Sequence, residues 1–347
     1  MTRARAGAVA VAAVVLVLTA VGPTSNSSRD GGSPASETGG LTAHASAAQA
    51  RPFRERWIAR GRHRIYAREY PGAGPPIVLM HGFPDDLTLY ERLVAHLRGR
   101  HVVAFDFLGW GRSDKPRRHD YTFDALQDDL DAVIRTLRLR RPVLVAHDSS
   151  GPPAINWALD HPREVGALGL LNTFYGLSPT LRPPEAIAIF GDLLEFRGAT
   201  MTGSRTSFSF ERLSRALARD RRMMRWLHRW QVGGFIRDRH VRREFLPRLW
   251  RGFGGEPSSI PAFLELNRDL ATAVVSNTGR AAELRSLRRP VRIVFGAADP
   301  TLNAGVARHF RELMPDAELF LIRRARHYVQ LDEPQRVARL LRSIPVP

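Results

Sequence analysis

Short apolar runs alternate with longer stretches of helical periodicity from Arg51 onward, and this alternation constrains the fold more than any other feature of the chain. The apolar runs predict strands over residues 77–83, 101–107, 142–148, 165–173, 291–299 and, with a turn, 317–327. The intervening stretches predict helices over residues 91–97, 123–137, 152–161, 304–314 and 333–344. Strands that alternate with helices predict an α/β protein with a doubly wound, mostly parallel sheet.

The alternation stops over residues 175–278. This stretch is helical or irregular by pattern, contains Trp226 and Trp230, and has no strand-like run. A helical insertion in an open sheet is expected to form a lid over the carboxyl ends of the strands, where such sheets bind ligands. We therefore expect a core made of residues 51–174 and 279–347, with an inserted helical lid domain over residues 175–278.

The first fifty residues have a different composition. Arg3 and Arg5 precede an unbroken run of small apolar residues from Ala6 to Val21, which is typical of an export signal. We take residues 1–22 as a signal peptide, with an uncleaved membrane anchor as the second interpretation. Residues 23–50 are rich in Ser, Gly, Ala and Thr and are expected to be a disordered linker. The protein is therefore expected to be exported, with membrane association only through its N-terminal segment.

Composition excludes several classes of site. The chain has no cysteine, so it has neither disulfides nor a cysteine nucleophile. Its formal net charge is +18, but Lys115 is its only lysine, and the arginines are scattered rather than gathered in a basic tail. We therefore expect no nucleic-acid partner. No group of His, Asp and Glu has the spacing of a metal site, so we expect no metal and no cofactor.

Three polar residues follow predicted strands: Asp148, Asp299 and His327. Each has an ordinary explanation on its own. Asp148 could cap the next helix, Asp299 before a proline could start a turn, and His327 could be a surface histidine beside arginines. Their joint placement at strand ends instead favours a catalytic set.

These residues and four stretches of sequence make the region 51–347 similar to the α/β hydrolases, and within that superfamily to epoxide hydrolases and haloalkane dehalogenases. The order nucleophile, acid and histidine is that of the α/β-hydrolase triad. The matching stretches are His81–Pro84 (HGFP), Asp106–Pro116 (DFLGWGRSDKP), Ala146–Gly151 (AHDSSG) and Asp299–Pro300 (DP).

The turn after residues 142–148 offers two candidate nucleophiles. The nucleophile turn of this superfamily is so tight that it requires small residues two positions before and two positions after the apex. With Asp148 at the apex these positions hold Ala146 and Ser150, which are both small. With Ser149 at the apex, the first of them is His147, which is too large. The register therefore favours Asp148.

The resemblance implies a two-step hydrolysis with an aspartate nucleophile. Asp148 would attack an sp³ carbon of a small hydrophobic epoxide or alkyl halide and form an alkyl ester. His327 would then activate a water, and Asp299 would orient the imidazole. The backbone N–H groups of Phe83 and Ser149 are the expected oxyanion donors.

The sequence departs from both families at their leaving-group donors. Haloalkane dehalogenases usually have a tryptophan after the nucleophile, where this chain has Ser149, and often have a halide donor where it has Phe83. Epoxide hydrolases use two lid tyrosines, but between Tyr175 and Tyr328 this chain has none. We take four residues as candidates for the substrate pocket: His81, Tyr175, Trp226 and Trp230.

Two alternative functions follow from the same residues. A serine-type carboxylesterase would use Ser149 as its nucleophile. An exported binding protein would keep the hydrolase fold without turnover, although the set of Asp148, Asp299 and His327 argues against it.

Overall fold

The computed structural model describes residues 51–184, 187 and 217–346. The predicted export segment and linker, over residues 1–50, lie outside the described residues, as does part of the predicted lid. Within the described ranges, no helix is long and apolar enough to cross a membrane.

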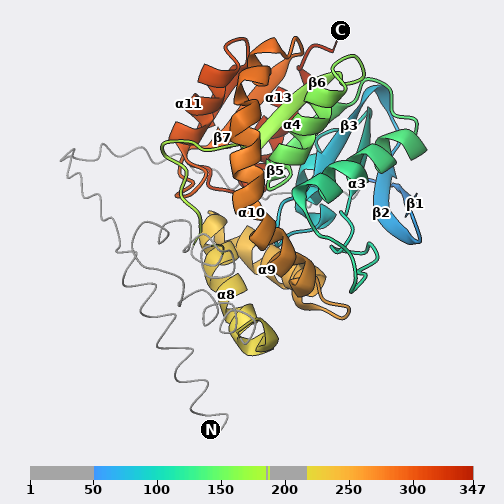
Figure 1. The fold of residues 1–347 in the computed structure, drawn as a ribbon, viewed down its shortest axis with the longest axis vertical. Helices are drawn as coiled ribbons and strands as arrows, with labels where there is room; N and C mark the ends of the chain where they lie inside the picture. The colour runs from blue at the N-terminus through green and yellow to red at the C-terminus, as the bar shows by residue number, and fades with distance from the viewer. Residues whose placement is uncertain (1–50, 185–186, 188–216, 347) are drawn as a thin grey trace, which may run out of the picture. The chain divides into compact units, whose positions relative to one another are not determined.

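One eight-stranded sheet organises the described chain (Figure 1). Its spatial order is β1-β2-β4-β3-β5-β6-β7-β8. The pairs β1·β2 and β2·β4 are antiparallel, and all the other neighbouring strands are parallel. The strands are β1 (Arg54–Arg60), β2 (His63–Tyr70), β3 (Ala73–Met80), β4 (Arg100–Phe105), β5 (Val143–Asp148), β6 (Ala167–Thr173), β7 (Val291–Gly296) and β8 (Glu318–Ile322).

The antiparallel hairpin of β1 and β2 was not predicted, because its strands are too charged to show an apolar run. Its register places Trp57 opposite Tyr66, and their rings lie 5.2 Å apart. Arg56 forms an ion pair with Glu69 at 2.6 Å. Cross-strand aromatic and charge pairs of this kind stabilise the edge of a sheet where one face is exposed to solvent.

Helices connect the parallel strands, as the alternation predicted. They are η1 (Leu87–Tyr90), α2 (Glu91–Val94), α3 (Phe123–Thr136), α4 (Gly151–Asp160), η2 (Ala281–Ser286) and α11 (Ala304–Leu313). Two more helices, α12 (Val329–Asp332) and α13 (Pro334–Arg342), follow the last strand. Figure 1 shows α3 and α4 side by side over the sheet, where they contact each other. The predicted helix over residues 91–97 is shorter, because a 3₁₀ turn precedes it and a turn ends it at Ala95.

Apolar side chains cover both faces of the central strands. On β5, Val143 and Val145 point to one face while Leu144 and Ala146 point to the other, and all four are fully buried. Val143 and Val145 share a core cluster with Leu341 of α13. Burial on both faces is what a parallel sheet requires.

The described part of the insertion includes three long helices between β6 and β7. They are α8 (Arg221–Phe235), α9 (Arg239–Gly254) and α10 (Ile260–Arg280). Asp220 and Asp238 cap the first two by accepting hydrogen bonds from backbone N–H groups of the first turn. The described residues from Arg51 to Val346 belong to one compact unit, and α10 runs two residues past the expected boundary at residue 278.

The order of the strands indicates where a ligand is expected to bind. β3 lies between β4 and β5, so the chain leaves β3 first to one side and later to the other. In open α/β sheets, ligands bind at the carboxyl ends of the strands that flank such a reversal. Here these ends are the turns after β3 and β5.

Candidate active site

The turn after β5 holds Asp148 in a strained backbone conformation. Its backbone φ is 52°, in the left-handed region that residues other than glycine rarely adopt. The carbonyl of Asp148 accepts a hydrogen bond from Thr173 Oγ1 at the end of β6. Three residues later, a Cβ at Gly151 would overlap Thr173. Asp148, and not Ser149, therefore occupies the apex of the turn.

His327 lies between two carboxylates that are distant in sequence. Its Nδ1 donates a hydrogen bond of 2.8 Å to Asp299 Oδ2. Its Nε2 lies 3.9 Å from Asp148 Oδ1. Burial alone would lower the pKa of His327, but Asp299 and Asp148 outweigh it and raise the pKa to about 9. The imidazole is therefore held in one orientation with Nε2 facing Asp148.

Asp299 is buried in a shell of hydrogen-bond donors. Its Oδ1 accepts bonds from Thr301 N–H at 2.9 Å, Thr301 Oγ1 at 2.8 Å and Leu302 N–H at 3.2 Å. Asn172 Nδ2 donates to its Oδ2 at 3.0 Å. Burial acts to raise the pKa of Asp299, but His327 and these donors outweigh it and lower the pKa. The carboxylate therefore remains ionised.

Two backbone N–H groups point at the carboxylate of Asp148. Phe83 N–H donates to Asp148 Oδ2 at 3.3 Å, and the Ser149 N–H also bonds to this carboxylate. The turn after β3 approaches so closely that a Cβ at Gly82 would overlap the Asp148 side chain. A glycine is therefore needed at this position for Phe83 to reach the carboxylate.

His81 braces this turn. Its Nδ1 donates to the Gly82 carbonyl at 2.6 Å, and its Nε2 accepts from Phe107 N–H at 3.2 Å. Burial lowers the pKa of His81 to about 4, so the ring is neutral. The sequence predicted His81 as a pocket residue, but both of its ring nitrogens are already engaged with backbone.

The other three predicted pocket residues have different partners in the structure. The Tyr175 hydroxyl donates to Asn156 Oδ1 at 2.8 Å on α4, not to Asp148. Trp226 and Trp230 are 48% and 41% exposed and stack on each other, with their centroids 6.0 Å apart. Residue type and position in the insertion could not reveal this, because a helix exposes or buries a tryptophan according to the face it presents.

Asp85 was missed by the sequence analysis, although it follows the HGFP stretch directly. Its Oδ1 accepts a hydrogen bond of 3.0 Å from the Tyr328 hydroxyl, and its Oδ2 has no partner in the described chain. Burial and the nearby Asp148 raise the pKa of Asp85 to about 7. A second buried carboxyl therefore lies close to Asp148 and His327.

Aromatic rings from the core and the insertion meet beside Phe83. The ring of Phe83 lies 6.2 Å from Trp110 and 5.8 Å from Phe263 of α10. Phe253 of α9 stacks on Trp110 at 6.4 Å. These rings give the carboxylate an apolar surrounding on one side, which suits a hydrophobic substrate.

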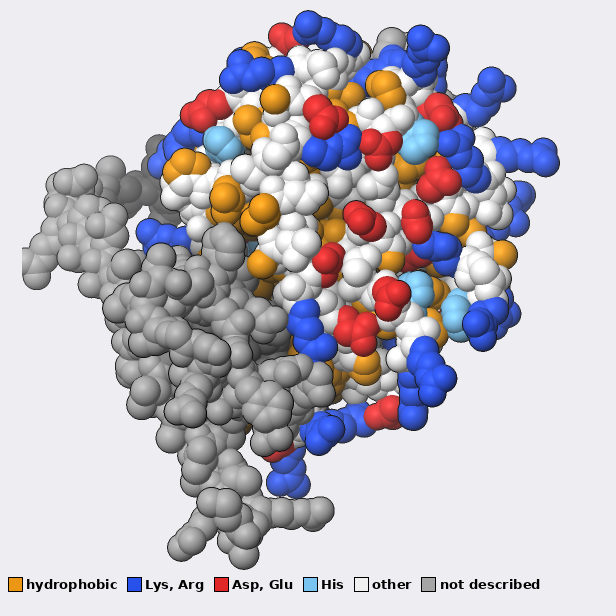
Figure 2. Space-filling model, viewed as in Figure 1, with side chains coloured by type: hydrophobic (Ala, Val, Ile, Leu, Met, Phe, Trp, Pro, Cys, Tyr) orange, Lys and Arg blue, Asp and Glu red, His pale blue; other side chains and the backbone are white. Residues whose placement is uncertain are grey.

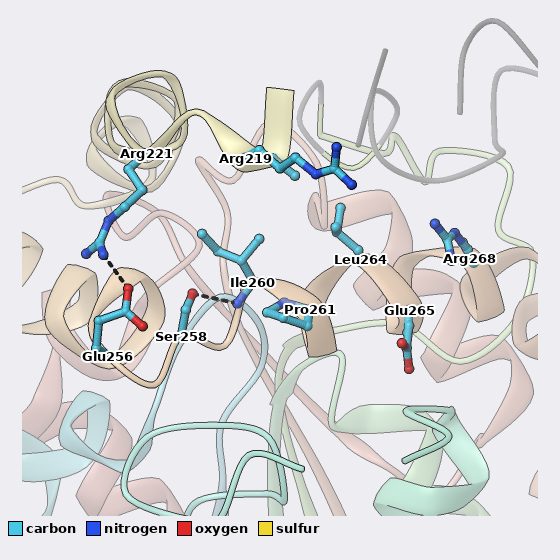
Figure 3. A pocket seen from close by; sticks show the side chains of 10 residues that line it. Arg219, Arg221, Glu256, Ser258, Ile260, Pro261, Leu264, Glu265 and Arg268 are labelled. Atoms are coloured by element: carbon cyan, nitrogen blue, oxygen red, sulfur yellow. Dashed lines mark hydrogen bonds and ion pairs between the residues drawn. The ribbon is translucent and has the colours of Figure 1, made fainter. Parts of the chain in front are cut away.

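A separate pocket of about 470 Å³ lies in the insertion (Figure 3). Charged side chains of both signs line it, including Arg221, which forms an ion pair with Glu256. Asp148, Asp299 and His327 are not part of its lining. In the part of the chain that the structure describes, no three His, Asp or Glu side chains are grouped as a metal site would need.

Comparison with known proteins identifies the family of the chain. The family model for the alpha/beta hydrolase fold matches residues 75–334. Haloalkane dehalogenase 2 of Mycobacterium tuberculosis (strain H37Rv) is 28% identical over 289 residues, covering 83% of this chain and 93% of that protein. A cis-3-alkyl-4-alkyloxetan-2-one decarboxylase of Xanthomonas campestris pv. campestris is 27% identical, covering 80% and 90%.

Among solved structures, haloalkane dehalogenase DbeA from Bradyrhizobium elkani USDA94 aligns with a TM-score of 0.66. It is 21% identical in sequence, and the alignment covers 83% of this chain and 96% of that chain. This likeness concerns the fold.

Proposed function

Because the chain belongs to the alpha/beta hydrolase fold family and is a hydrolase, we propose that Asp148 is its nucleophile and that it acts on a small hydrophobic epoxide or alkyl halide. The observation that carries this proposal is a carboxylate at the apex of the strained turn, facing His327 Nε2 and bound by two backbone N–H groups. A serine esterase would need the hydroxyl of Ser149 in that place.

The first step is displacement at carbon. Asp148 Oδ1 forms a bond to an sp³ carbon, and the bond from that carbon to the halogen or the epoxide oxygen breaks with its electron pair. A halide leaves as an anion, whereas an epoxide oxygen stays on the alkyl group and takes up a proton from a water molecule, which is left as hydroxide. The N–H groups of Phe83 and Ser149 hold the other carboxylate oxygen, so it becomes the carbonyl oxygen of the ester.

The second step is hydrolysis of that ester. His327 Nε2 takes a proton from water, and the hydroxide adds to Cγ of Asp148. The resulting oxyanion lies where Phe83 and Ser149 donate. Its collapse breaks the bond to the alkoxide, which takes the proton from the His327 imidazolium and leaves as the alcohol. Asp299 stabilises the imidazolium that forms. Ester formation also removes the charge of Asp148, one of the anions that raise the pKa of His327. The pKa of the imidazole therefore falls after the first step, and a larger fraction of it is neutral and able to accept a proton.

The substrate class rests on the surroundings of Asp148 and on the relatives. The rings of Phe83, Trp110 and Phe263 favour an apolar substrate. The relatives act, by their names, on haloalkanes and on a dialkyl-substituted oxetanone ring, which are both apolar electrophiles. The HGFP turn and the lack of a halide donor at Phe83 and Ser149 favour the epoxide over the halide.

Both steps should slow as the pH falls, but around different midpoints. Burial raises the pKa of Asp148, so ester formation should fall with decreasing pH sooner than it would for an exposed aspartate. Ester hydrolysis should also rise with pH, because His327 must be neutral, and its midpoint should lie below the pKa of about 9 that the imidazole has beside ionised Asp148. Single-turnover measurements by rapid quench and mass spectrometry separate the two rates. A pH-independent hydrolysis rate would contradict the assignment of His327 as the base.

Trapping the ester tests the proposed function. We expect His327→Ala to form the ester but not to hydrolyse it, because the general base is gone. Incubation with a pool of epoxides and haloalkanes should raise the intact mass by a whole epoxide, or by a haloalkane less its halogen and the proton that Asp148 would carry. Peptide mapping should place the adduct on Asp148.

The matched control is the double variant His327→Ala with Asp148→Asn, which should gain no mass. If folded His327→Ala stays unmodified by substrates that demonstrably bind, the aspartyl mechanism is wrong.

The location of the protein stays a prediction from residues 1–22, and we propose that it is exported to the cell envelope or beyond.

A further inference from the structure

We propose that the exposed face of α8 docks onto the anionic phospholipid surface of a membrane. We call this face the Arg–Trp face, and define it by Arg222, Arg225, Trp226, Arg229 and Trp230. The proposal concerns where the protein binds and does not depend on the chemistry at Asp148.

The spacing of these residues places them on one side of the helix. They follow one another at intervals of three, one, three and one, which keeps them within one stripe of an α-helix. All five are exposed. The opposite side of α8 is buried and packs toward α9 through Met224, Leu227, His228 and Val232. An ordinary amphipathic helix has a polar outer face, but the outer face of α8 carries two large aromatic rings as well as charge.

The two indoles are the first independent observation. Trp226 and Trp230 are 48% and 41% exposed, and they stack with only 2° between their planes. Tryptophan is usually buried in a water-soluble domain, but it concentrates at the level of lipid headgroups in membrane-bound proteins. Because each ring already covers one face of the other, the pair is poorly placed to stack on nucleic-acid bases. It suits insertion as one block between headgroups.

The charge on α8 is the second observation. The helix has no acidic residue, and no described Asp or Glu side chain pairs with Arg222, Arg225 or Arg229. The core differs, since Figure 2 shows acidic side chains among its arginines. Arg135 pairs there with Glu164, and Arg280 with Asp160. A helix face that combines unneutralised arginines with tryptophans complements a surface of lipid phosphates.

The insertion that contains α8 also reaches the candidate active site. Phe253 of α9 and Phe263 of α10 belong to the aromatic group beside Phe83, whose N–H bonds to Asp148. Docking through α8 would therefore hold the insertion at the bilayer, where apolar compounds concentrate. No described helix spans a bilayer, so this binding would be peripheral.

Vesicle flotation of the full-length protein tests the proposal. The probes are phosphatidylcholine vesicles with and without phosphatidylglycerol at physiological ionic strength. We expect wild type to float only with the anionic vesicles. The double variant Arg225→Glu, Arg229→Glu should have a vesicle partition coefficient at least about tenfold lower than wild type. The reason is that loss of each arginine near an anionic surface weakens binding by roughly tenfold or slightly less.

The control variant is Arg336→Glu with Arg339→Glu on α13, which changes the net charge equally at two other exposed arginines. It should bind like wild type. The Trp226→Ala, Trp230→Ala variant should bind more weakly and should lose the blue shift of tryptophan fluorescence that wild type shows with anionic vesicles.

Three results would overturn the proposal. The α8 and α13 variants could bind equally, which would mean that only net charge matters. Binding could be as strong to phosphatidylcholine alone. Binding could also vanish on deletion of residues 1–22 and be unaffected by the α8 changes. Thermal unfolding of each variant checks that a weaker binder is still folded.

Discussion

Asp148→Asn should reduce turnover by at least about 10⁴-fold, the scale on which removal of a covalent nucleophile acts in enzymes of this kind. An amide is a far weaker nucleophile than a carboxylate and cannot form the alkyl ester. Asparagine is nearly isosteric and tolerates the left-handed backbone that Asp148 adopts, so the fold should persist. The measurement is product formation from whichever epoxide or haloalkane the trapping experiment identifies, with circular dichroism as the check on folding.

Ser149→Ala is the matched control, one residue away in the same turn. Because Ser149 contributes its backbone N–H, which alanine keeps, this variant should stay within about tenfold of wild type. The opposite pattern, with Ser149→Ala inactive and Asp148→Asn active on activated esters, would make the protein a serine carboxylesterase. Ligand binding without turnover in wild type would support the non-catalytic alternative.

Asp299→Asn should slow ester hydrolysis by roughly 10³–10⁴-fold, as loss of the orienting carboxylate does in hydrolytic triads. Four donor contacts from Asn172, Thr301 and Leu302 already surround this carboxylate. An asparagine there can accept hydrogen bonds through one oxygen only. Its NH₂ group would either face one of the donors that surround Asp299, or donate to Nδ1 of His327 and so favour the tautomer with the proton on Nε2. The pKa of His327 should fall, because Asp299 is the strongest of the charges that raise it.

We expect the Asp299→Asn variant to keep the rate of ester formation while the rate of ester hydrolysis falls. Asp148 is untouched, so the first turnover should still release halide or open the epoxide while the ester accumulates in the intact mass. Thr301→Val is a milder control that removes one hydroxyl donor to Asp299 and should cost far less than the Asn substitution. Equal slowing of both steps by Asp299→Asn would show that the residue acts on the fold of the site rather than on His327.

The strand and helix pattern was largely readable from the sequence, because buried parallel strands are continuous apolar runs. β5, expected over residues 142–148, spans Val143–Asp148, and β7 lies within the range 291–299. The hairpin of β1 and β2 could not be found in this way. Its outer strand is solvent-facing and full of arginine, and its pairing depends on contacts such as Trp57 with Tyr66 that only the folded ladder creates.

The structure brings together the predicted site residues that follow strands, and it gives other partners to predicted residues whose role depends on side-chain direction. Asp148, Asp299 and His327 follow strands that end at one edge of the sheet, and the structure brings them within hydrogen-bond or ion-pair range. Tyr175 instead bonds to Asn156 on α4. The position of Asp85 beside the site follows from folding, because its hydrogen-bond partner Tyr328 lies 243 residues away in the sequence.

The sequence by itself determined the fold class, the register of the nucleophile turn and the order of the three polar residues. These depend on local pattern, namely apolar runs, turn glycines and the size of residues on either side of Asp148. The tertiary structure alone decided which atom of His327 faces Asp148, which donors keep Asp299 ionised, and which face of α8 carries its tryptophans outward. Those properties depend on packing between segments that are far apart in the chain, because burial and side-chain orientation follow from the neighbours that folding supplies.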